Sequence, residues 1–116
     1  MSYRIIPTPV FQRDVKYLKK KYHRIGSDLE RLNSILIDNP AYGDAVTGLE
    51  GRVFKARLAS SDISKGKSGG FRIVYYLNNS DNTIYLLTIY AKAYKEDINP
   101  VEIKALLKKV GLADFK

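Results

Sequence analysis

The chain begins with a short extended pattern that changes to helical spacing. Residues 3–7 alternate weakly and include two isoleucines, which predicts a short edge strand ending at a proline. Thr8 and Pro9 then supply an N-cap and the proline favoured at the first helical position. Apolar residues recur at helical spacing as far as Tyr22. We therefore predict a strand followed directly by a helix from Pro9 to Tyr22.

A second helix is predicted immediately after the first. Gly26 interrupts the first pattern, Ser27 is a suitable N-cap, and the pair Asn39-Pro40 stops the helix. Its predicted buried stripe consists of Ile25, Leu29, Leu32 and Leu36. Two consecutive helices with a short link form an antiparallel hairpin, whose joint apolar stripe needs a sheet to cover it.

The second half of the chain changes to strand periodicity. Residues 41–51 contain three glycines and are predicted to be a connecting loop. Three strands are predicted after it, separated by a polar loop and a turn, over residues 53–59, 71–77 and 83–90. The first alternates apolar residues with cations, whereas the third is apolar on both faces, as expected of a central strand covered on each side. We predict that the three strands form an antiparallel meander.

A third helix completes the predicted fold. Asn99, Pro100 and Glu102 provide an N-cap, a first-position proline and an N3 glutamate, and the helix is predicted to run to about Val110 before Gly111. No internal repeat is present. We therefore predict one α+β domain over residues 1–116, in the order β-α-α-β-β-β-α, with the helical hairpin packed against the sheet.

Composition narrows the classes of function. The 116 residues, 45% of them hydrophobic, suffice for one two-layer core. No run of roughly 18 apolar residues is present, and the N-terminus lacks the apolar segment of a secretory signal, so we expect a cytoplasmic protein with no membrane partner. The absence of cysteine excludes thiol nucleophiles and thiolate metal sites. With His23 as the single histidine, we expect no metal and no other cofactor.

Positive charge is the strongest remaining signal. The net charge is +8, which favours a polyanionic partner, and nucleic acid fits best because cations gain affinity by releasing counterions from phosphates. Between residues 52 and 72 six cations face one anion, Asp62. A meander would bring cations of this segment close to Lys92, which follows the third predicted strand. The predicted basic hollow is lined by Arg57, Lys65, Lys67, Arg72 and Lys92. The predicted stacking partners for bases are Tyr76, Tyr90 and Tyr94.

These residue types suit phosphodiester transfer without a metal ion. A 2′-hydroxyl can attack the adjacent phosphate if its proton is removed, the phosphorane charge is stabilised and the leaving 5′-oxygen is protonated. Arginine suits the stabilising task, because its planar fork holds two phosphate oxygens and keeps its charge. A lysine surrounded by cations and desolvated by bound RNA can move protons.

Simpler interpretations exist for the same features. Lysine and arginine alternating with apolar residues form, more often than not, an ordinary solvated sheet face. The loop over residues 65–70 lacks the full phosphate-loop pattern and lies between strands. His23 is better explained as a surface or capping residue than as a catalytic one. A second basic group around the first helix is usually an exposed helical face, although it could also bind ribosomal RNA: Arg13, Lys16, Lys19, Lys20, Lys21 and Arg24.

Several motifs, in order, resemble the HigB-like branch of the RelE/ParE superfamily of toxins. They are Lys55-Ala56-Arg57-Leu58, Lys65-Gly66-Lys67-Ser68-Gly69-Gly70, Phe71-Arg72-Ile73-Val74-Tyr75-Tyr76 and Leu86-Leu87-Thr88-Ile89-Tyr90-Ala91-Lys92. The resemblance spans nearly the whole chain. It implies a small RelE-like fold and a metal-independent, ribosome-dependent endoribonuclease that cleaves messenger RNA and inhibits translation. It also implies a cognate antitoxin protein, with operator DNA bound through the toxin–antitoxin complex.

The resemblance assigns roles to individual residues. The catalytic residues that it implies are Arg72, Arg57, Lys92 and Lys55. We assign the stabilisation of phosphorane charge to Arg72 and proton transfer to Lys55 or Lys92. The loop lysines, Lys65 and Lys67, are expected to bind backbone phosphates. RelE-like chains often place a tyrosine near the C-terminus in the site, and the corresponding region of this chain contains Tyr94.

The sequence is also compatible with two other functions. A ParE-like toxin has the same fold and poisons DNA gyrase without cleaving RNA. A degenerate toxin would be a non-catalytic nucleic-acid-binding partner of a repressor. The cationic residues of the predicted strands favour RNA cleavage over gyrase poisoning, and mutation of Arg72 distinguishes a catalytic toxin from a non-catalytic one.

Overall fold

The computed structural model describes residues 3–62, 69–95 and 97–112. The elements are β1 (Arg4–Pro7), α1 (Pro9–Lys19), α2 (Ile25–Asp38), β2 (Asp44–Ala45), β3 (Val53–Leu58), β4 (Phe71–Asn78), β5 (Thr83–Ala91) and α3 (Pro100–Lys109). The five strands form one sheet in the order β1-β5-β4-β3-β2, in which β1 runs parallel to β5 and the other pairs are antiparallel. The predicted α+β class and the β3-β4-β5 meander are confirmed.

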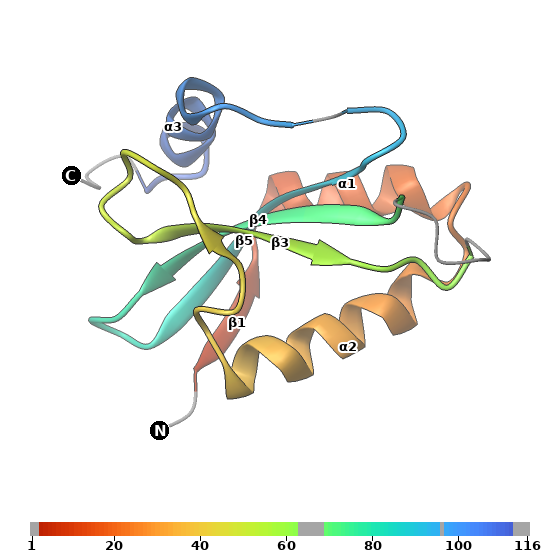
Figure 1. Ribbon diagram of the computed structural model, residues 1–116, viewed down its shortest axis with the longest axis horizontal. Helices are drawn as coiled ribbons and strands as arrows, with labels where there is room; N and C mark the ends of the chain where they lie inside the picture. The colour runs from red at the N-terminus through yellow and green to blue at the C-terminus, as the bar shows by residue number, and fades with distance from the viewer. Residues whose placement is uncertain (1–2, 63–68, 96, 113–116) are drawn as a thin grey trace.

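Helices cover both faces of the sheet. On one face, apolar residues of α1 and α2 such as Phe11 and Leu32 pack against alternate residues of β3, β4 and β5. On the other face, Ile103 and Leu107 of α3 pack in a second cluster that includes Val74. Figure 1 shows α3 set apart from α1 and α2. The central strand β5 contributes to both clusters, which confirms the prediction that it is covered on each side.

The helix boundaries follow the predicted caps in two cases out of three. The Thr8 hydroxyl accepts a hydrogen bond from the N–H of Phe11 at 3.3 Å, and a capping box begins α3. Ser27 was predicted as the N-cap of α2, and this prediction is wrong. The helix begins at Ile25 with Arg24 at the N-cap position, so Ser27 lies inside it and donates its hydroxyl hydrogen to the carbonyl of Arg24 at 3.1 Å. Helix α1 also ends at Lys19, before the predicted boundary at Tyr22.

The segment predicted to be only a connecting loop, residues 41–51, contains the short edge strand β2. Its approach to β3 depends on Gly43, because a Cβ there would lie 2.6 Å from the carbonyl oxygen of Lys55. The N–H of Gly43 donates to the hydroxyl of Tyr75 at 3.0 Å, and this hydroxyl donates to the carbonyl of Pro40 at 2.7 Å. A buried tyrosine of β4 thus fixes the segment against the sheet.

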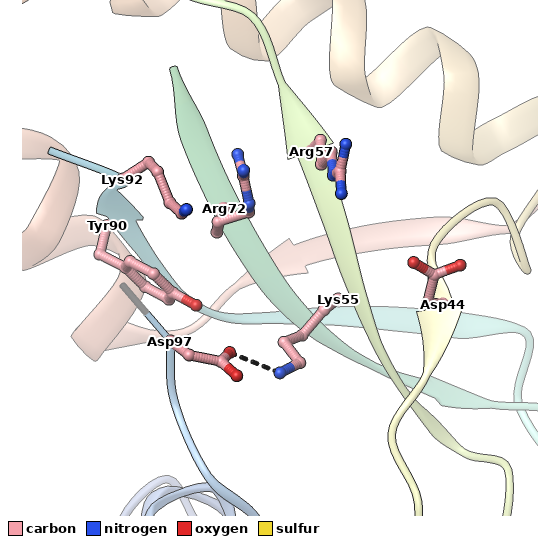
Figure 2. Close-up of a pocket in the computed structure, with 7 residues that line it drawn as sticks. All are labelled: Asp44, Lys55, Arg57, Arg72, Tyr90, Lys92 and Asp97. Carbon is pink, nitrogen blue, oxygen red and sulfur yellow. Dashed lines mark hydrogen bonds and ion pairs between the residues drawn. The ribbon is translucent and has the colours of Figure 1, made fainter. Parts of the chain in front are cut away.

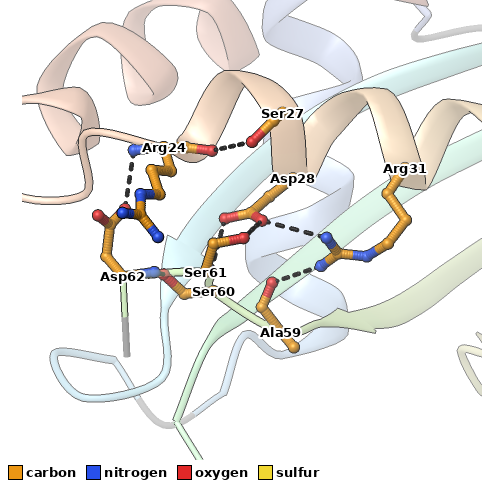
Figure 3. Close-up of polar contacts among 8 residues, drawn as sticks. All are labelled: Arg24, Ser27, Asp28, Arg31, Ala59, Ser60, Ser61 and Asp62. Carbon is orange, nitrogen blue, oxygen red and sulfur yellow. Dashed lines mark hydrogen bonds and ion pairs between the residues drawn. The ribbon is translucent and has the colours of Figure 1, made fainter. Parts of the chain in front are cut away.

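A buried carboxylate joins α2 to the segment after β3 (Figure 3). Asp28 is completely buried and accepts hydrogen bonds from the N–H and the hydroxyl of Ser61 and from the guanidinium of Arg31 at 3.2 Å. Arg31 also donates to the carbonyl of Ala59 at 2.7 Å. No local pattern in the sequence marks Asp28 as buried, because its partner Ser61 lies 33 positions away along the chain.

Within the described ranges, none of the helices combines the length and apolar character needed to cross a membrane.

Candidate functional site

One cross-strand row of the sheet carries two arginines side by side. Arg57 of β3 pairs directly with Arg72 of β4, and Arg72 pairs with Tyr90 of β5. Like charges directly opposite each other destabilise a sheet. In the part of the chain that the structure describes, neither guanidinium forms an ion pair with a carboxylate. This charge arrangement costs stability, so it indicates a site for an anion rather than a structural role.

A hollow of about 250 Å³ opens over this row, on the face of the sheet that α3 partly covers (Figure 2). Its lining consists of Asp44, Lys55, Arg57, Arg72, Tyr90, Lys92 and Asp97. All four residues that the sequence analysis nominated as catalytic line this hollow. They come from β3, β4 and the end of β5, and strand pairing places them together.

Local contacts restrain the guanidinium of Arg72 and the backbone of Lys92. The Nη1 atom of Arg72 donates to the carbonyl of Phe71 at 3.2 Å and lies 3.5 Å from the carbonyl of Gly69, so the half-buried guanidinium is restrained. The backbone N–H of Lys92 donates to the carbonyl of Gly70 at 3.0 Å, which holds the residue after β5 beside the start of β4. Preoriented charge stabilises a reacting group without further reorganisation.

An ion pair occupies one side of the hollow. The ammonium of Lys55 lies 2.6 Å from a carboxylate oxygen of Asp97 and 3.4 Å from the carbonyl of Ile98. The hydrogen bond from Lys55, followed by one from the N–H of Ile98, lowers the pKa of the Asp97 carboxyl. Asp97 is therefore ionised at neutral pH and keeps a negative charge inside a basic hollow.

Comparison with known proteins identifies the family. The family model described as the RelE toxin of the RelE / RelB toxin-antitoxin system matches residues 4–113. The chain belongs to the RelE toxin family. It is thus a toxin of the type II toxin–antitoxin class, and the superfamily predicted from the motifs is confirmed.

Two solved structures share the RelE fold. A free double arginine-to-alanine mutant of the E. coli toxin RelE is 16% identical, with a TM-score of 0.61, and the match covers 95% of this chain and 99% of that chain. The RelBE2 toxin–antitoxin complex of Mycobacterium tuberculosis contains a chain that is 22% identical, with a TM-score of 0.55. That match covers 77% of this chain and 96% of the other.

The three predicted stacking tyrosines have different positions in this RelE toxin. Tyr90 lines the hollow, and its burial raises the pKa of its phenol to about 12, so the ring carries a hydroxyl donor at neutral pH. Tyr76 lies in the apolar cluster beneath α3, with its ring centroid 6.1 Å from that of Tyr85. Tyr94 is 66% exposed and accepts a hydrogen bond from Lys21. The structure therefore brings only Tyr90 of the three into the hollow.

Other nominated residues lie elsewhere. Lys65 and Lys67 lie outside the described residues. The cations around α1 and His23 are exposed, and none of them lines the hollow. Among the residues that the structure describes, no three His, Asp or Glu side chains are grouped in a way that could hold a metal ion.

The candidate site includes residues that were not nominated from the sequence. Asp44 and Asp97 line the first hollow, and a second hollow of about 190 Å³ shares Asp44, Lys55 and Arg57 with it. Tyr42 and Gly43 complete the wall of the second hollow. In the sequence, the only sign of this wall is a tyrosine and an aspartate on either side of a glycine, a pattern that is common in loops. The pairing of β2 with β3 places these residues at the site.

Proposed function

We propose that this toxin is a metal-independent endoribonuclease of the HigB-like kind, which cleaves messenger RNA on the ribosome and thereby inhibits translation. The observation that carries the proposal is the directly paired Arg57 and Arg72 in an open hollow, with Lys55 and Lys92 beside them. Two guanidinium groups on one row match the oxygens of a single phosphate. Such an activity acts in the cytoplasm, where ribosomes are found.

The residues of the hollow can supply each task of the reaction. The 2′-oxygen forms a bond to phosphorus, the bond from phosphorus to the 5′-oxygen breaks, and the products are a 2′,3′-cyclic phosphate and a 5′-hydroxyl. Arg72, assisted by Arg57, stabilises the extra negative charge of the phosphorane. Lys55 or Lys92 moves the protons. The ammonium of Lys55 donates to Asp97 in the free toxin, and a phosphate that displaces Asp97 would free this ammonium to donate to the leaving 5′-oxygen.

A cognate antitoxin is the proposed protein partner. One of the solved neighbours is a toxin–antitoxin complex. The basic hollow would attract an acidic segment of the antitoxin, which would neutralise the toxin by excluding RNA. We further propose that the toxin contacts operator DNA through this complex and thereby contributes to repression of its own synthesis.

Primer extension in a bacterial translation extract tests the proposal. We expect the toxin to produce cuts within codons when ribosomes are present and no cuts when they are removed. The transition-metal chelator 1,10-phenanthroline should leave cleavage unchanged, because arginine and lysine supply the charge and the protons. Intact messages together with accumulated gyrase–DNA cleavage complexes would support a ParE-like poison instead. Intact messages together with undiminished protein synthesis in the extract would support the non-catalytic alternative.

Neutralising Asp97 should strengthen RNA binding. The variant Asp97→Asn removes a negative charge from the hollow and releases Lys55 for a phosphate, so we expect several-fold tighter binding of a non-cleavable RNA. The slope of log affinity against log salt should steepen by about 0.7, as for one additional phosphate contact to a single strand. Fluorescence anisotropy over a salt series measures both quantities. Unchanged affinity and slope would show that the Lys55–Asp97 pair does not compete with RNA.

A further inference from the structure

The second hollow has a wall that carries an exposed aromatic ring and a carboxylate. Tyr42, Gly43 and Asp44 form this wall, and residues of β3 that include Arg57 form the other. The Tyr42 side chain is 43% exposed. Within the described part of the chain, neither its hydroxyl nor the carboxylate of Asp44 has a hydrogen-bond or ion-pair partner. Both groups are therefore available to a ligand.

The wall is held rigidly beside the arginine pair. The hydrogen bonds through the Tyr75 hydroxyl attach Gly43 and Pro40 to the sheet, and Asp44 pairs with Lys55 in the β2–β3 ladder. The Tyr75 ring is itself buried and stacks on Phe54 with a centroid distance of 5.4 Å. A ligand that enters this hollow does not have to order the wall first, which lowers the entropic cost of binding.

We propose that the second hollow binds one nucleobase of the RNA strand whose phosphate lies between Arg57 and Arg72, with Tyr42 stacking on the base and Asp44 accepting hydrogen bonds from its Watson–Crick edge. The inference rests on the proposed ribonuclease function and extends it to base selection. Because Asp44 and Arg57 line both hollows, one strand can occupy the two hollows with adjacent groups.

The two residues contribute differently to recognition. Every base has a π-face, so stacking on Tyr42 adds affinity without sequence preference. An ionised carboxylate only accepts hydrogen bonds, so Asp44 selects bases that present donors. Guanine places a ring N–H beside an amino group and can donate both to one carboxylate. The single N–H of uracil lies between two carbonyl oxygens, which repel it. The subsite therefore favours guanine and disfavours uracil.

Binding of short RNAs to the isolated toxin tests the subsite apart from catalysis. Tetranucleotides with a 2′-O-methyl group at each ribose cannot undergo 2′-hydroxyl attack, and guanine or uracil is moved through each position in turn. We expect guanine at one position to bind about tenfold more tightly than uracil. Tyr42→Ala should weaken binding of all the RNAs about tenfold, while Tyr42→Phe keeps the ring and the affinity. Asp44→Asn should abolish the preference for guanine.

Matched controls separate this result from general effects. Tyr17, on α1, is 71% exposed and lines neither hollow, so Tyr17→Ala should bind as the wild type does. Circular dichroism establishes that every variant is folded. Equal affinity for all bases, or loss of affinity in Tyr17→Ala equal to that in Tyr42→Ala, would overturn the subsite.

Cleavage mapping on ribosomes distinguishes the two proposals. The toxin could show base-dependent binding that is lost in Asp44→Asn and yet cleave no RNA on ribosomes. This result would overturn the ribonuclease function and support the subsite. Ribosome-dependent cleavage whose base profile is the same in wild type, Tyr42→Ala and Asp44→Asn would support the ribonuclease function and overturn the subsite.

Discussion

Replacing Arg72 by alanine is expected to lower the rate of messenger RNA cleavage on the ribosome by about 10²–10³-fold, as when one preorganised donor to a developing oxyanion is lost. Arg72 lies in the middle of the cross-strand row and is restrained by the carbonyl of Phe71. Arg72→Lys should recover little, because an ammonium cannot hold two phosphate oxygens in a plane. Primer extension under single-turnover conditions measures the effect.

Arg4 provides the matched control for this prediction. It is an exposed arginine on β1 and lines neither hollow, so Arg4→Ala should cleave at the wild-type rate. The stability of Arg72→Ala should not fall, since the variant relieves repulsion from Arg57 across the β3–β4 pair. Full cleavage activity in Arg72→Ala would contradict the proposed role of Arg72. Unfolding of Arg72→Ala would contradict the inference that the paired arginines cost stability.

Replacing Asp28 by alanine is expected to destabilise the toxin by about 3 kcal/mol. The substitution removes the acceptor of three hydrogen bonds and leaves the N–H of Ser61 and part of the Arg31 guanidinium without a partner. Urea unfolding followed by circular dichroism measures the change. Asp38 is exposed at the end of the same helix, so Asp38→Ala should change the free energy of unfolding by no more than about 0.5 kcal/mol. Equal effects of the two substitutions would contradict this account.

The destabilisation by Asp28→Ala should depend on pH in a defined direction. Burial raises the pKa of the Asp28 carboxyl, but the hydrogen bonds from Ser61 and Arg31 outweigh burial, so the pKa in the folded protein is lowered. A carboxyl with a lowered pKa stabilises the fold fully above its ordinary pKa, and this stabilisation is lost as the pH falls through the lowered value. The difference between wild type and variant should therefore be largest near neutral pH and shrink in acid. A difference that grows in acid would contradict the sign.

Local sequence signals predicted most of the fold. The caps at Thr8 and Asn99 depend on residues within one helical turn, so they can be recognised without knowledge of the rest of the chain. The continuous apolar pattern of β5 predicted a central strand, because both faces of such a strand are buried. The alternation in β3 likewise predicted which face would present Lys55 and Arg57. The resemblance of the motifs to the RelE/ParE toxins then nominated Lys55 and Arg57, together with Arg72 and Lys92, as catalytic.

Other features depend on contacts between distant segments. The pairing of β1 with β5 joins residues about 80 positions apart, and nothing in residues 3–7 specifies a parallel partner. The strand β2 has only two residues and exists because Gly43 allows close approach to β3. Ser27 has the residue type of an N-cap, yet α2 begins at Ile25, a buried member of the core beneath the sheet. The early start of α2 buries the Ile25 side chain, and the cap signal at Ser27 did not predict this start.

The sequence by itself determined the class of the fold, the expectation of a basic hollow and the chemistry that arginine and lysine can supply, because these follow from periodicity and residue type. Only the tertiary structure decided that Asp97 neutralises Lys55, that Asp28 is buried, and that Tyr42 and Asp44 border the arginine pair. A single tyrosine or aspartate in a loop has no periodicity to mark it. Its environment is set by the strands and helices that fold against it, and this environment decides whether it is solvated, buried or part of a site.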